Sequence, residues 1–267
     1  MPELSEITYS HDTTVHAFRD YFRFLVEMYM DDAEILEPPP GGCFGKTDEV
    51  IALLRDIPYI REVGPYHPAH GSALCHWADW QFEAGSACRQ VAGKEELSVG
   101  EALRVMSGGV VTEDVPPHVV GLTLGDRENK HFLLDTQLGI VHWPVEDGGG
   151  KHMYNFNQDP KFIKPVEDDP EDYAPENEHE WRTDPPAWAI GDFFELLKSQ
   201  YRKLNWIPVN PREVITITAH YEEDLAGMVP MLQEIYRQHG WPLEQGGCLE
   251  AVKIALNERY PSFEGWD

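Results

Sequence analysis

The stretch from His118 to Trp143, HVVGLTLGDRENKHFLLDTQLGIVHW, constrains the fold more than any other part of the chain. It contains three short apolar runs, at Val119–Leu124, His131–Leu134 and Ile140–Trp143, which are rich in Val, Ile, Leu and aromatic residues. Clusters of Gly, Asp and Asn separate the runs, and this pattern is typical of strands joined by turns. Because such short connections join only antiparallel neighbours, the stretch predicts a small antiparallel sheet.

Amphipathic helices are predicted on both sides of this stretch. Residues 12–30 and 188–204 carry large apolar and aromatic side chains at helical spacing, which indicates a helix with a buried face. In the first of these helices, Asp12, Thr13 or Thr14 is expected to cap the start. Further helices are predicted at 47–56, 98–106, 228–238 and 247–260.

The type of element stays open in two segments. Residues 77–89 fit a helix better than a strand. Residues 212–219 fit either an edge strand, because all of 214–218 are β-branched, or the start of a helix. Repeated Pro and Gly predict a loop over 58–76.

These elements together predict an α+β fold, with a small central antiparallel sheet flanked by several helices and a long acidic loop insertion. We expect a single domain over 1–267. Its expected parts are helical at 1–110, the sheet core at 116–144, the acidic insertion at 145–187, and helical at 188–267.

The charge balance excludes several classes of partner. The chain has 21 basic and 47 acidic residues, a net charge of −26. Phosphate contacts need clusters of Lys and Arg, so nucleic acid is not an expected partner, and an anionic membrane surface is disfavoured. The start of the sequence lacks the pattern of a secretory signal, and no apolar run approaches the roughly 18 residues of a membrane span. A cytoplasmic location with four reduced cysteines is therefore expected.

The acidic insertion is the first candidate binding region. Between Glu167 and Asp184 there are nine acidic residues against Arg182 alone among Lys and Arg. A solvated acidic loop explains them, and so does electrostatic attraction of a basic protein partner. No calcium-loop register is present. The candidate partner-binding residues are Glu167, Asp168, Asp169, Glu171, Asp172, Glu176, Glu178 and Glu180.

A second candidate region is the loop that carries histidine and cysteine at 67–88. His67, His70 and His76 have the donor chemistry for zinc, with Cys75 beside them, but their spacing matches no helical zinc motif. Surface or capping histidines are the favoured interpretation, so no metal and no cofactor is predicted.

A third motif, GGCFGKT at 41–47, is similar to a phosphate-binding loop. It is one residue too short, because Pro40 stands where the first glycine is required. Nucleotide hydrolysis is therefore not predicted, and no other motif of a common enzyme class is present.

The segments Val119–Asp126, His131–Trp143 and Ala187–Leu197 resemble the SMI1/KNR4-like family, also called the SUKH superfamily. The resemblance covers about a third of the chain, and the overall style of the sequence is similar to that of filamentous-fungal proteins. It implies an α+β fold with a central antiparallel sheet, and a role in protein binding as an immunity protein or scaffold. It carries over no catalytic residue. The acidic insertion and the helices after Asn210 depart from the family pattern.

Three functional hypotheses follow from the sequence. The first is a non-enzymatic protein-binding, scaffold or regulatory protein whose acidic surface meets a partner protein. The second is an enzyme of unfamiliar class, metal-dependent or thiol-dependent, that uses the 67–88 loop. The third is a homo-oligomeric structural protein that buries its surplus aromatic residues between copies.

Overall fold

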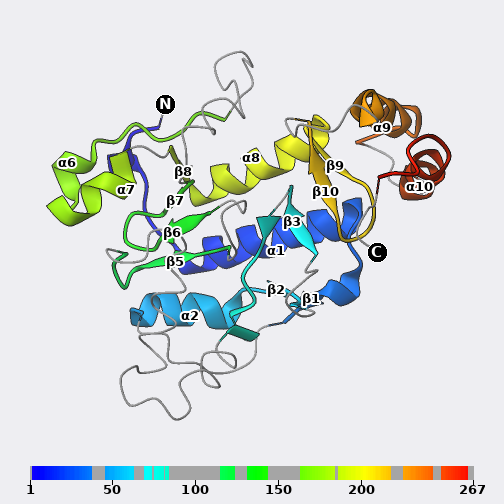
Figure 1. The fold of residues 1–267 in the computed structure, drawn as a ribbon. Coiled ribbons are helices and arrows are strands. Elements are labelled where there is room, and N and C mark those ends of the chain that lie inside the picture. Colours follow the sequence, from blue (N-terminus) through cyan, green and yellow to red (C-terminus); the bar gives the residue numbers. More distant parts are fainter. Residues whose placement is uncertain are drawn as a thin grey trace, which may run out of the picture.

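The fold is α+β, as seen in a computed structural model of the chain (Figure 1). The structure describes residues 2–37, 46–62, 69–73, 75–80, 82–83, 115–123, 131–143, 163–183, 186–217, 225–242 and 248–263. The helix expected at 98–106 lies outside these residues, as do His67, Cys43, Cys88 and most of the 41–47 motif.

The central sheet confirms the three predicted strands and adds a fourth. Its strands are β5 (Val119–Gly121), β6 (Leu133–Asp135), β7 (Ile140–His142) and β8 (Ala187–Ala189). They pair in the order β5-β6-β7-β8, and every pair is antiparallel. The helix expected from residue 188 therefore begins later, because residues 187–189 are extended and pair with β7.

The alternation of side chains along the strands creates two different faces. One face, formed by Val120, Leu134, Val141 and Trp188, belongs to the main core. The opposite face is also buried but carries two polar residues, Asp135 and His142, among its apolar ones. We call this second face the polar face of the sheet. Its residues are Val119, Gly121, Leu133, Asp135, Ile140, His142, Ala187 and Ala189.

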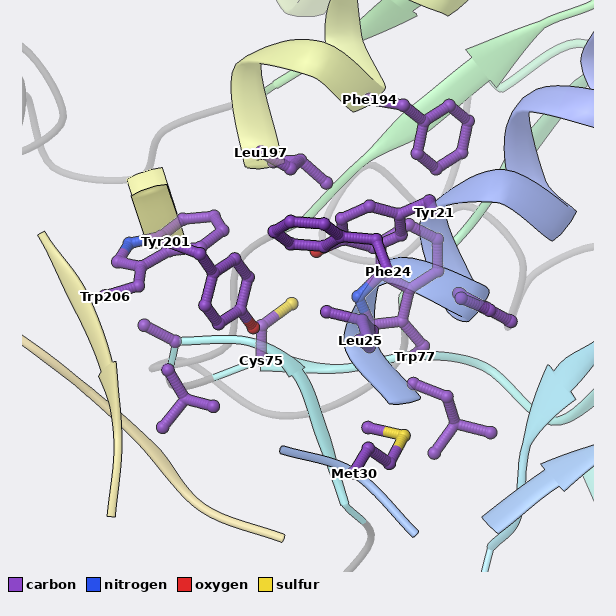
Figure 2. Close-up of a cluster of buried hydrophobic side chains, with 14 of the residues drawn as sticks. Tyr21, Phe24, Leu25, Met30, Cys75, Trp77, Phe194, Leu197, Tyr201 and Trp206 are labelled. Atoms are coloured by element: carbon purple, nitrogen blue, oxygen red, sulfur yellow. The ribbon is translucent and has the colours of Figure 1, made fainter. Parts of the chain in front are cut away.

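Two long helices pack on the main-core side of the sheet. Helix α1 (His11–Met28) and helix α8 (Ile190–Arg202) contact each other along their lengths and run side by side in Figure 1. Large aromatic side chains fill the space between them and the sheet. Figure 2 shows part of this core, in which Tyr21 and Phe24 of α1 approach Tyr201 of α8 and Trp77. Buried tyrosine hydroxyls here donate hydrogen bonds to backbone carbonyls; the Tyr21 hydroxyl, for example, donates to the Gly71 carbonyl.

The helices predicted within the described residues are confirmed, but the expected cap of α1 is not. Ser10 is the N-cap, and its hydroxyl accepts from the Thr13 N–H at 3.4 Å, so the cap lies before the three expected residues. Three further predicted helices are α2 (Asp48–Asp56), α9 (Met228–Gln238) and α10 (Cys248–Arg259). Two short turns are η1 (Leu4–Glu6) and η2 (Asp32–Glu34).

The loop predicted over 58–76 is wrong in its described parts, because short strands there find distant partners. The pairs are β1 (Ile35–Leu36) with β2 (Tyr59–Ile60), and β3 (His70–Ser72) with β4 (Cys75–His76). The open segment near 214 is a strand, since β10 (Val214–Thr216) pairs with β9 (Trp206–Pro208). Trp77 is extended and bridges Thr123, so the helix considered there does not begin at 77.

The β5 edge of the sheet is closed by side chains. Lys46 Nζ donates a hydrogen bond to the Val119 carbonyl at 2.7 Å. Trp80 Nε1 donates to the Gly121 carbonyl at 3.2 Å. The lysine of the Gly-Lys-Thr run is therefore buried against the sheet, with its charge directed at a backbone carbonyl.

The β8 edge is closed by backbone. The Val166 N–H donates to the Ala187 carbonyl at 2.7 Å. The N-terminal segment then lies beyond it, since the Glu167 N–H donates to the Pro2 carbonyl at 2.9 Å. These contacts tie the start of the described acidic segment to the sheet.

Candidate functional site

The described part of the acidic insertion is folded and packs on the polar face of the sheet. Residues 170–183 carry α6 (Pro170–Tyr173), η4 (Glu176–Glu178) and α7 (His179–Thr183), so the prediction of a loop is wrong for these residues. We call residues 167–183 the acidic arm. It lies at the periphery of the molecule, away from α9 and α10 (Figure 1).

Asp135 is the anchor of the arm on the sheet. It ends β6, and its Oδ1 accepts from the N–H groups of Gln137 and Leu138 at 2.8 and 2.9 Å, which holds the following turn. Its Oδ2 accepts from Arg182 Nη2 of α7 at 2.9 Å. Asp135 is fully buried, so this oxygen needs a partner within the protein.

Arg182 joins the arm to two strands at once. Its Nε donates to Glu178 Oε2 at 2.9 Å, and its Nη1 lies 3.1 Å from His142 Nε2 on β7. The guanidinium also lies over the Trp181 ring, 4.2 Å from the centroid. Arg182 and Glu178 are both buried, so the two carboxylates and the guanidinium form one desolvated network.

The contact with Arg182 fixes the ionisation of His142. A guanidinium only donates hydrogen bonds, so Nε2 of His142 must carry a lone pair and the proton of the neutral ring must sit on Nδ1. Burial, and then the charge of Arg182, lower the pKa of His142 to about 3. Nδ1 has no hydrogen-bond partner among the described residues.

His118 lies on the other side of Asp135. Its Nε2 is 3.7 Å from Asp135 Oδ2. Burial lowers the pKa of His118 and outweighs the attraction of Asp135, so the site disfavours an ion pair between the two groups.

The candidate partner-binding residues divide into exposed and interior groups. Asp168 is half-buried, accepts from the Tyr173 hydroxyl at 2.7 Å, and has its pKa raised by burial. Glu178 is 6 % exposed and is directed at Arg182. The side chain of Glu180 lies outside the described residues. The exposed group comprises Glu167, Asp169, Glu171, Asp172 and Glu176.

The histidine and cysteine loop does not assemble a metal centre in its described part. His70 and His76 face each other across β3 and β4 with ring centroids 5.0 Å apart. His70 Nδ1 lies 3.2 Å from the Val214 N–H, and Cys75 is buried. Within the described ranges, no group of three or more His, Cys, Asp or Glu side chains is placed to hold an ion.

Comparison with known proteins adds no relative: no family model, no curated protein and no solved structure matches the chain. Among the described helices, none is long and apolar enough to cross a bilayer.

Sequence reasoning missed the network of Arg182. In the sequence, Asp135 directly follows the apolar run His131–Leu134, at the predicted turn, and a turn accounts for its Oδ1 but not for its Oδ2. The available signal was the position of Asp135 and His142 on a strand face that is otherwise apolar, because a buried polar group there requires a partner.

Proposed function

We propose that this chain is a non-enzymatic protein-binding or scaffold protein of the SMI1/KNR4-like type, and that the acidic arm is the surface that meets a basic partner protein. The proposal includes a cytoplasmic location. It requires no metal or cofactor.

One observation carries this proposal: the basic side chain of the arm, Arg182, is directed inward, while five of its acidic side chains are exposed. The guanidinium of Arg182 contacts Asp135, Glu178 and His142 in the interior, so it does not neutralise the acidic side chains on the surface of the arm. Five carboxylate side chains remain exposed on a short folded segment. Like charges held together on a fixed scaffold create a stronger local potential than the same charges on a free chain.

The fixed position of the arm also favours binding over simple solvation. A disordered acidic loop would lose conformational entropy when a partner orders it, whereas a folded arm has already lost that entropy. The backbone contacts of Val166 and Glu167 and the buried ion pairs of Arg182 supply this order.

The experiment compares two variants with the same loss of charge. The first carries Glu171→Gln, Asp172→Asn and Glu176→Gln in the arm. The control carries Glu27→Gln, Glu250→Gln and Glu258→Gln at exposed positions on α1 and α10. Proteins captured from cell extract by the wild-type chain are identified, and cross-links are mapped to residues of both partners.

A discrete basic partner should cross-link near the arm, bind less as salt rises from 50 to 500 mM, and be lost by the arm variant but not by the control. Equal loss in both variants would mean that net charge alone attracts the partner. Salt-insensitive capture, or cross-links confined to other surfaces, would contradict the proposal.

A further inference from the structure

The attachment of the acidic arm differs from that of the other helices. The arm contributes Trp181 to a small apolar cluster with Val115, Val119 and Leu133, separate from the main core. The charged network around Arg182 also attaches the arm to the polar face. A segment held by a small satellite cluster opens locally at a lower free energy than elements of the main core.

The network around Arg182 is compatible only with a neutral His142 ring. Arg182 Nη1 lies 3.1 Å from His142 Nε2, so protonation of that nitrogen would place two donors and two positive charges against each other in a buried site. The clash is relieved if α7 moves away, because both the guanidinium and the imidazolium then reach water.

From this arrangement we propose that the acidic arm, apart from Glu167, is a pH-released segment: acidification detaches residues 168–183 from the polar face of the sheet by protonating His142 against Arg182. Residues 163–167 stay in place, because they are held through backbone hydrogen bonds at the β8 edge rather than through the network.

The sign of the effect follows from the two states of His142. Attached, its pKa is about 3; released, it returns toward the ordinary value of 6.5. A depressed histidine pKa means that attachment is fully stable above 6.5 and is progressively lost as pH falls toward 3. Below 6.5 the equilibrium constant for release rises about tenfold per pH unit, which gives about thirtyfold between pH 7.5 and pH 5.

Two other groups near Arg182 also have shifted pKa values in the attached state. Burial lowers the pKa of His118, so its protonation also favours release. Asp168 acts in the opposite sense, because burial raises its pKa in the attached state. In the described part of the chain, the remaining neighbours are Asp135 on β6, Glu178 on η4, Tyr173 on α6, Trp181 on α7 and Lys46 beside β5. Measurements at pH 5 and above stay clear of about 4, where ordinary carboxyl groups titrate.

The test is hydrogen exchange of the full chain, read as protection factors so that the pH dependence of exchange itself cancels. In the wild type, protection of 168–183 should fall about thirtyfold from pH 7.5 to pH 5, while protection in α1 stays constant. His142→Gln keeps an acceptor for Arg182 but does not titrate, so the fall in protection should shrink to the part that His118 contributes. The exposed His239→Gln should behave as wild type.

Two results would overturn the proposal: constant protection of the arm in the wild type, or an equal fall in His142→Gln. A second measurement needs no variant. Ring-nitrogen shifts of His142 at pH 5 should show a neutral ring with Nδ1 protonated whenever the arm is attached, and a doubly protonated ring in the attached state would refute the mechanism. Loss of partner binding in acid would rest on the proposed function, but the exchange experiment contains no partner and so tests release alone.

Discussion

Replacing Arg182 with methionine should weaken the attachment of the arm more than any other single change in it. Methionine has a comparable apolar stem, so the change removes charge with little loss of volume. Asp135 Oδ2, fully buried, then loses its donor, and Glu178 loses its ion pair. Removing one member of a buried ion pair costs about 3–5 kcal/mol, because the charge left behind stays desolvated.

A double-mutant cycle with Asp135→Asn separates the pair from its surroundings. Asparagine keeps Oδ1, so the bonds to Gln137 and Leu138 persist while the charge opposite Arg182 is lost. On this background Arg182→Met should cost less, by a coupling free energy of about 1.5–3 kcal/mol, since a hydrogen bond between charged groups is worth that much.

Two probes are needed because the arm can detach before the core unfolds. Urea unfolding followed by circular dichroism at 222 nm reports the core, and exchange protection of 168–183 reports the arm. For Arg182→Met we expect the protection of the arm to fall by the full free-energy cost given above. We expect the free energy of unfolding of the core to fall by the same amount or less. Additive effects of the two substitutions, with coupling below about 0.5 kcal/mol, would refute the view that Arg182 and Asp135 act together.

Two further predictions concern the main body of the fold. Phe193→Ala should lower the free energy of unfolding by about 3–5 kcal/mol in a urea titration, because Phe193 is fully buried. The control Phe82→Ala should cost far less, because Phe82 is 39 % exposed, and equal unfolding midpoints for the two variants would contradict the assignment of the core. Gly139→Ala should destabilise the protein by more than about 1 kcal/mol in a thermal melt, because φ of Gly139 is +72° and a Cβ there would lie 2.8 Å from the Tyr9 backbone nitrogen. The control Gly191→Ala has open space around it and should be neutral or stabilising; the reverse order of stability would show that the turn at Gly139 is not constrained.

Periodicity predicted the elements whose apolar spacing is long and regular. Helices α1 and α8 and strands β5–β7 were found because their own side chains define a buried face. Strand β8 was missed because Ala187-Trp188-Ala189 has no strand signature of its own. It is extended because the open edge of β7 offers unpaired backbone groups, which is a property of the sheet rather than of the segment.

The network at the polar face was beyond local reasoning for a similar reason. Arg182 and Asp135 lie far apart in the sequence, and no local pattern around either residue predicts that the two form an ion pair. The small strands β2, β3 and β4 depend on partners in the same way, although Pro and Gly surround them. Short elements of this chain are decided by tertiary contacts, and long ones by pattern.

The closed edges of the central sheet restrict how any partner can be recognised. An extended peptide joins a sheet by taking up the free backbone groups of an edge strand. At β5, the carbonyls of Val119 and Gly121 already accept hydrogen bonds from the side chains of Lys46 and Trp80. At β8, the edge is covered by the backbone of residues 166–167. Recognition by strand addition is therefore blocked at this sheet, which also protects the protein from edge-to-edge aggregation. At this sheet, contacts with other molecules must be made through side chains.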